Sequence, residues 1–301
     1  DGGKTWTNTF TNVPGLKPNA WINAVDASHF DTATAYVSAS HWQSGDYAPY
    51  FYKTSDYGRT WTKITNGLLP RGWSHVIRED PKNPNLLYGG TENGLYASWD
   101  QGASWVSIRN NMPAVPVRDI KIHPRDNDII VATHGRGIYI LDDAAPFQEL
   151  TSAMKAEAYL FPVRPAIRWA GGSGMFRQNE RDWIAPNPPA GAYINLYLRT
   201  EPKQPLTVTI ADKTGRTVRT LRNLRGRAGV NRFVWDLRHD NPAARPDAAT
   251  AAGPAGGGGR GGFGSSGPAV LPGDYVIKVN AGGRELSAPV TVRLDPGVTA
   301  S

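Results

Sequence analysis

The chain has 301 residues, which is enough for two domains that each bury a core of their own. Its 33 glycines, 24 prolines, 10 tryptophans and 12 tyrosines, with few helix-period runs, predict an all-β protein of short strands and turns. The absence of cysteine excludes disulfides, thiol nucleophiles and thiolate metal sites. No apolar run reaches the roughly 18–20 residues that cross a bilayer, so we expect no membrane insertion.

The formal charge of +7 is unevenly distributed along the chain. Residues 1–150 carry 13 Lys and Arg against 15 Asp and Glu, whereas residues 151–301 carry 20 against 11. The basic character therefore belongs to the second half. Its densest stretch, 216–232, contains six arginines, which we interpret as a solvated strand edge rather than a site for polyanions.

Three segments of the first half share one pattern: a strand, a turn rich in Asp, Asn or Pro, and a second strand. These segments are 22–40, 74–91 and 117–134. The first two continue into a third strand, a turn of the form Asp-x-Gly-x-Thr/Ser-Trp, and a fourth strand. Four short strands in about 44 to 52 residues is the period of a β-propeller blade. Residues 1–150 are therefore predicted to form a partial β-propeller of about three four-stranded blades plus one strand.

The Asp-x-Gly-x-Thr/Ser-Trp turn occurs at the start of the chain and twice more. We expect its aspartate to accept backbone N–H bonds from two residues on, and its glycine to adopt a positive φ. The Thr or Ser offers a second local hydrogen bond, and the Trp can lie between blades as an apolar plug. The motif is thus interpreted as a structural turn without a catalytic part. Its residues are Asp1, Gly3, Thr5, Trp6, Asp56, Gly58, Thr60, Trp61, Asp100, Gly102, Ser104 and Trp105.

These turns resemble the Asp-box (BNR) repeats of sialidases, sortilin-type propellers and xyloglucanases, in which the boxes lie away from the ligand site. Residues 120–143, followed by the strand at 160–169, are similar to the last blade of large bacterial sortilin-like proteins that are often labelled glycosyl hydrolases. The resemblance implies that more blades precede this point in the parent protein. It also implies a secreted or periplasmic location.

Prolines and glycines mark residues 151–189 as a connector. Residues 190–298 then show strand-like alternation between turn signals, which predicts an Ig- or fibronectin-like β-sandwich. Its segments resemble the Ig-like module of the flagellar hook-capping protein. The Gly-rich stretch 248–268 is predicted to be a disordered loop of this sandwich. Because it offers only Arg260 and Phe263 for phosphate contact and stacking, we expect no nucleic-acid partner.

Two pairs of residues are candidates for function in the propeller part. Asp26 and Asp119 lie in the first strands of their blades, nearest the propeller axis, where two carboxylates about 5 to 10 Å apart could flank a glycosidic bond. His134 and Arg136 lie in the turn 133–137, which is either a rim loop that binds a ligand or a plain hairpin turn. The histidines show no metal-ligand spacing, so we expect no metal and no cofactor.

Two functions from different classes follow from these observations. The first, which we favour, is a non-catalytic fragment of a secreted bacterial Asp-box propeller that binds a polysaccharide or a protein partner. The second is part of a xyloglucanase- or sialidase-like glycoside hydrolase with an incomplete cleft, in which Asp26 or Asp119 would act as the acid. The open edges of an incomplete propeller predict self-association, or pairing with the remaining blades of the parent.

Overall fold

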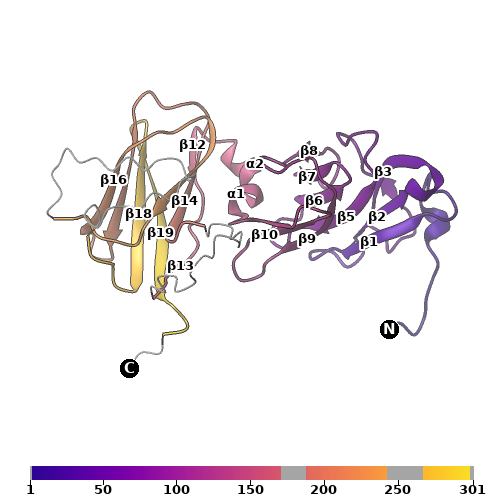
Figure 1. Cartoon of the computed structure of the whole chain (residues 1–301), viewed down its shortest axis with the longest axis horizontal. Coiled ribbons are helices and arrows are strands. Elements are labelled where there is room, and N and C mark those ends of the chain that lie inside the picture. The colour runs from indigo at the N-terminus through magenta and orange to yellow at the C-terminus, as the bar shows by residue number, and fades with distance from the viewer. Residues whose placement is uncertain (1, 171–187, 243–266, 299–301) are drawn as a thin grey trace, which may run out of the picture. The chain divides into compact units, whose positions relative to one another are not determined.

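The computed structural model of the chain describes residues 2–170, 188–242 and 267–298 (Figure 1). It divides into two compact units, Asp1–Gln148 and Glu149–Ser301, in which strands dominate. The predicted all-β fold is confirmed. Among the described residues, no helix is both long and apolar enough to cross a membrane. Asp1 and the predicted loop 248–268, up to residue 266, lie outside the described residues.

The first unit consists of three antiparallel sheets in which consecutive strands pair as neighbours, the arrangement of propeller blades (Figure 1). The first sheet contains β1 (Trp21–Ala27), β2 (Ala35–His41), β3 (Asp46–Thr54) and β4 (Thr62–Lys63), with short 3-10 turns at η1 (Phe10–Asn12) and η2 (Trp42–Ser44). The second sheet contains β5 (Ser74–Glu79), β6 (Leu87–Thr91), β7 (Gly94–Ser98) and β8 (Val106–Ser107). The third sheet contains β9 (Val117–Ile122), β10 (Ile129–Thr133) and β11 (Ile138–Leu141). This unit is a partial β-propeller, as predicted.

The middle sheet is buried on both faces because a neighbouring sheet packs against each of them. Phe51 of the first sheet packs with Ile77 and Trp105 in one apolar cluster, and Val76 packs with Val117 of the third sheet in another. Two adjacent glycines in β6 allow this close approach. A Cβ on Gly89 would lie 2.8 Å from the ring of Phe51, and one on Gly90 would lie 2.6 Å from the backbone carbonyl of Val117.

The strand count differs from the prediction at both ends of this unit. The third sheet has three strands rather than four, because the chain after Leu141 turns at Asp143, which has a φ of 64°, and enters helix α1 (Ala145–Gln148). We call the three Asp-x-Gly-x-Thr/Ser-Trp turns the first, second and third box in chain order. The single strand expected after the first box is not formed. Its Trp6 is 89% exposed, and residues 6–9 belong to none of the sheets among the described residues.

The second unit is a β-sandwich whose two sheets enclose one apolar core. After helix α2 (Leu150–Ala153), the smaller sheet contains β12 (Ala158–Leu160), β14 (Ala192–Leu198) and β17 (Gly229–Trp235). The larger sheet contains β13 (Ala166–Arg168), β19 (Arg284–Leu294), β18 (Gly273–Ala281), β15 (Leu206–Asp212) and β16 (Thr217–Leu224). Trp235 is fully buried in this core. Its ring meets the ring of Tyr275 edge to face, with 5.3 Å between the ring centroids.

Part of the range that the sequence predicts to be a connector, 151–189, belongs to this sandwich. β12 pairs with β14, and β13 runs parallel to β19. Residues 171–187 of this range lie outside the described residues. The strand predicted at 160–169 is divided between the end of β12 and β13, because Pro162 and Pro165 lie between them and proline cannot donate to a sheet ladder.

Candidate functional site

The second and third boxes, the turns that contain Asp56 and Asp100, form the same hydrogen bonds. Asp56 accepts the backbone N–H of Thr60 at 2.9 Å, the Thr60 hydroxyl at 2.6 Å and the Thr54 hydroxyl at 2.8 Å. Asp100 accepts the corresponding bonds from Ser104 and Ser98 at 2.5–2.8 Å. The carboxylate therefore bonds to the N–H four residues on, and not two residues on as the sequence suggested.

The N–H two residues after each aspartate is satisfied by a hydroxyl instead. Gly58 donates to Thr54 Oγ1 at 2.9 Å, and Gly102 donates to Ser98 Oγ at 2.7 Å. Both glycines, and Gly3 of the first box, have a positive φ. Tyr57, just before Gly58, also has a positive φ.

The box aspartates are held in their charged form by these bonds. The hydrogen bonds from Thr60 lower the pKa of Asp56 to about 2. Burial alone would raise the pKa of Asp100, but the bonds from Ser104 and Ser98 outweigh it and the pKa is lowered. A carboxylate that stays ionised, and whose oxygens accept hydrogen bonds within its own turn, is a poor general acid.

The box tryptophans have unequal environments. Trp105 is buried, donates from its indole N–H to the Ile64 carbonyl at 2.8 Å, and packs against Phe51 at 5.2 Å between ring centroids. Trp61 is half-buried in the apolar cluster on the other face of the first sheet, whereas Trp6 is exposed. Trp105 thus lies between two blades.

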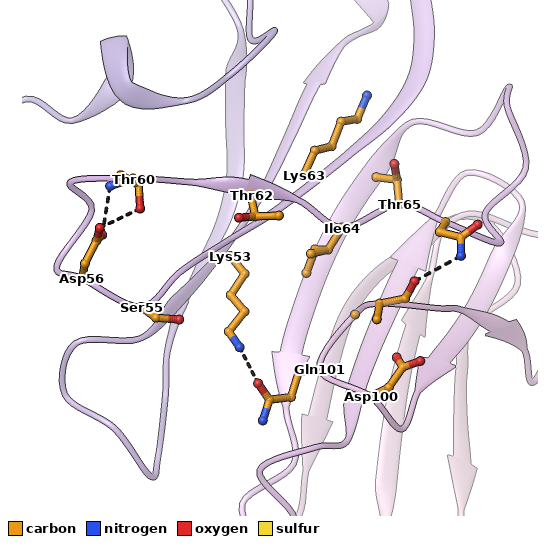
Figure 2. A pocket seen from close by; sticks show the side chains of 13 residues that line it. Lys53, Ser55, Asp56, Thr60, Thr62, Lys63, Ile64, Thr65, Asp100 and Gln101 are labelled. Atoms are coloured by element: carbon orange, nitrogen blue, oxygen red, sulfur yellow. Dashed lines mark hydrogen bonds between the residues drawn. The ribbon is translucent and has the colours of Figure 1, made fainter.

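A polar pocket of about 530 Å³ lies between the second box, which contains Asp56, and the third, which contains Asp100 (Figure 2). Figure 2 shows Lys53 reaching from β3 to Gln101, to which it donates a hydrogen bond, and Asp56 bonded to Thr60. The Lys63 ammonium lies over the ring of Tyr50, 4.2 Å from its centroid. The charged groups around this pocket are therefore already engaged by neighbouring side chains, which leaves it a weak ligand site.

A line of charges joins the first strands of the three blades. Arg78 on β5 donates to Asp119 on β9 at 2.9 Å, and its other terminal nitrogen lies 3.6 Å from the carboxylate of Asp26 on β1. Arg78 also donates to the backbone carbonyls of Ile77 and Ile120. The structure thus brings the two predicted acids to one group, but places a guanidinium between them.

The side chain of Asp26 is more buried than that of Asp119, with 17% against 45% of it exposed. A second carboxylate, that of Glu79, lies in its surroundings. Asp26 accepts the N–H of Glu79 at 2.8 Å, and the carboxylate of Glu79 is itself buried under Ser28 and Tyr36. Burial raises the pKa of Asp26, although the Glu79 N–H and the Arg78 guanidinium oppose that shift. Asp26 therefore holds a proton more readily than an exposed aspartate does.

The opposite end of the blades from the boxes is formed by the β2–β3, β4–β5 and β6–β7 connections, and we call it the upper rim. His75 at the start of β5 is buried there, with Nε2 at 2.9 Å from the Glu92 carboxylate and Nδ1 at 3.2 Å from an Arg118 nitrogen. Arginine can only donate, so Nδ1 accepts and Nε2–H donates to Glu92, which is the neutral tautomer. Burial lowers the pKa of His75, and the charge on Arg118 acts in the same direction.

The second predicted pair, His134 and Arg136, is exposed in the β10–β11 turn at the same end. The turn is closed by Thr133, whose N–H and hydroxyl both donate to the Gly137 carbonyl. His134 is close enough to His75 to lower its pKa electrostatically. The pair thus borders the upper rim but shares no hydrogen bond with the His75 network among the described residues.

Three aromatic residues of the upper rim were missed by the sequence reasoning. Trp42 comes from the β2–β3 connection, Tyr47 from the start of β3, and Trp73 from the β4–β5 connection. Trp42 stacks on Trp73 at 6.0 Å with 24° between their planes, and Tyr47 lies 5.6 Å from Trp73. Their signal in the sequence is that they flank glycines in predicted connections, where large aromatic residues have no core to fill.

No cluster of three or more His, Cys, Asp or Glu that could hold a metal ion occurs within residues 2–170, 188–242 and 267–298. No family model matches the chain. Over 132 residues it is 29% identical to the oligoxyloglucan-reducing end-specific xyloglucanase of Emericella nidulans, a match that covers 38% of this chain. The chain spans 15% of the length of that relative.

Several solved structures show a distant likeness. The GH74 enzyme of Niastella koreensis is 18% identical with a TM-score of 0.34, covering 40% of this chain and 21% of that one. The GH74 xyloglucanase of Xanthomonas campestris is 16% identical with a TM-score of 0.32, covering 72% and 39%. YCF48 bound to D1 peptide is 14% identical with a TM-score of 0.32, covering 73% and 60%.

Proposed function

We propose that the blades of the first unit bind a polysaccharide and do not hydrolyse it. The observation that carries the second part is the position of Arg78 between Asp26 and Asp119. Hydrolysis of a glycosidic bond needs two carboxylates on either side of the sugar, with room for the substrate and, in inverting enzymes, a water. Here the intervening space holds a guanidinium that pairs with both carboxylates.

The polysaccharide part of the proposal is supported by the relative. The curated protein that shares 29% identity over 132 residues is named as a xyloglucanase. The upper rim adds side chains suited to a sugar, since it presents aromatic rings next to hydrogen-bonding groups. The sortilin-like Asp-box class, the Ig-like character of the second unit and export to the periplasm or medium belong to the same proposal.

A glycoside hydrolase is the second candidate, and one observation favours it. The pKa of Asp26 is raised, as a general acid requires. Because both carboxylates contact one guanidinium, oxygens of Asp26 and Asp119 lie no more than roughly 9 Å apart, which does not exceed the separations found in glycoside hydrolases. A substrate that displaced Arg78 would turn this ion-paired group into an acid and base pair.

The test is to measure binding and turnover on the same protein sample. The full chain is run on native gels containing soluble xyloglucan, and reducing ends are assayed after prolonged incubation with the same polymer. Retardation without reducing-end release is the expected result. Release that is lost in both Asp26→Asn and Asp119→Asn would establish the hydrolase instead. Neither retardation nor release on a panel of soluble glycans would refute the polysaccharide proposal and leave a protein partner as the ligand.

A further inference from the structure

Trp42, Tyr47 and Trp73 form one continuous aromatic surface on the upper rim, which we call the aromatic platform. Trp42 is 44% exposed and Tyr47 is 38% exposed, although each ring also contacts Trp73. Large aromatic side chains contribute most to stability when they are buried. Rings that are held against one another and still present a face to solvent are typical of a binding surface.

The platform is fixed in place by the loops that carry it. Gly72 N–H donates to the Tyr47 carbonyl at 2.9 Å, which joins the β4–β5 connection to the start of β3. Glu92 N–H donates to the Trp73 carbonyl at 3.0 Å, so the β6–β7 connection holds the platform from the other side. A ligand that docks here therefore loses little free energy to ordering of the rings, because they are already held in place.

The surroundings of the platform indicate a neutral ligand with hydroxyl groups. The Arg71 guanidinium lies over the Tyr47 ring at 5.1 Å, in a cation–π contact. Behind Trp73, the His75 ring meets it edge-on at 6.1 Å, and the carboxylate of Glu92 is paired with His75. The nearby charges are thus engaged within the protein, while their remaining polar atoms can exchange hydrogen bonds with hydroxyl groups.

We infer that the aromatic platform is the polysaccharide-binding site and that it takes a chain of neutral, β-linked glucose units; this inference rests on the proposed function. A pyranose with equatorial substituents presents its axial C–H groups on two flat, weakly polar faces, which stack on aromatic rings. Its equatorial hydroxyls point outward to a polar fringe. In a β-1,4-linked glucan every unit keeps this flat shape, whereas the α-1,4 linkage coils the chain and limits stacking to isolated units.

The test compares the two linkages on the full chain and on matched variants. Isothermal titration calorimetry with cellohexaose and maltohexaose measures the dissociation constants. Trp42→Ala and Tyr47→Ala are expected to weaken cellohexaose binding at least tenfold, and Trp42→Phe, which keeps a ring, is expected to weaken it less. Trp169→Ala, which removes a 57% exposed tryptophan from the second unit, is the control and should leave the constant unchanged. Circular dichroism melts establish that each variant is folded.

The outcomes separate this inference from the function on which it rests. Cellohexaose binding that survives both Trp42→Ala and Tyr47→Ala would refute the platform and keep polysaccharide binding. Tighter binding of maltohexaose than of cellohexaose would refute the ligand class. Failure of the unmodified chain to bind either oligosaccharide, while it is retarded by polymeric xyloglucan, would also refute the inference. Failure to bind any glycan would refute the proposed function itself.

Discussion

Arg78 and Asp119 lie on the first strands of two neighbouring blades, and their side chains meet at 2.9 Å. The same guanidinium lies 3.6 Å from Asp26, so one side chain connects the first strands of three blades. Arg78 and Asp26 are each only 17% exposed in their side chains. Removing the arginine would leave a mostly buried carboxylate without its main counter-charge.

Arg78→Met is therefore expected to lower the free energy of unfolding of the first unit by about 1–3 kcal/mol. Urea denaturation followed by circular dichroism measures this change. Arg125→Met is the matched control, because Arg125 is 78% exposed and pairs with the adjacent Asp126 on the surface, where solvent screens the ion pair and it contributes little. Equal losses in the two variants would show that the bridge across the blades adds no stability.

Gly102 and Gly45 form a second matched pair, because both have a positive φ and only one has a close neighbour. A Cβ on Gly102 would lie 2.5 Å from the Ile64 side chain, whereas a Cβ on Gly45 would meet nothing within 4 Å. Gly45→Ala is expected to cost about 1 kcal/mol from backbone strain alone. Gly102→Ala should cost about 2–4 kcal/mol, because it also forces the third box away from the first blade. Thermal denaturation that ranks the two variants equally would contradict the proposed packing at the box.

The local parts of this fold were predictable from sequence, and the contacts between blades were not. The turns at Asp56 and Asp100 could be predicted because their bonding partners lie within four residues along the chain, although the N–H that each aspartate accepts is four residues on and not two. The bridge through Arg78 joins residues more than 40 positions apart, and its register depends on how the sheets pack. The stacking of Trp42 on Trp73 also joins two connections, which strand periodicity cannot place relative to each other.

His75 is expected to titrate below the ordinary histidine pKa of 6.5, because burial and Arg118 disfavour its charged form. A lowered folded-state pKa means that protons bind the unfolded chain more readily. The free energy of unfolding should therefore fall as the pH drops through the ordinary histidine range and stop falling below the folded pKa. NMR titration of the His75 ring, identified by its loss in His75→Asn, measures the pKa directly.

A variant of Glu92 checks the cause of this shift. Glu92→Gln should lower the pKa of His75 further, because the carboxylate favours the charged ring. Glu285→Gln removes a carboxylate paired with Lys278 in the second unit, and should leave the titration of His75 unchanged. A His75 pKa at or above 6.5, or an upward shift in Glu92→Gln, would contradict the hydrogen-bond network described for the upper rim.

The self-association expected from an incomplete propeller stays a prediction, and β11 is where it can be tested. β11 is the edge of the third sheet, and its Ile138 and Ile140, two residues apart and hence on one face, are 68% and 59% exposed. An exposed apolar edge strand favours pairing with a second chain. Sedimentation velocity should therefore show association that increases with protein concentration, and Ile140→Lys should reduce it. Leu271→Lys, at a loop position that is 73% exposed in the second unit, should not, and a monomer at every concentration would refute the prediction.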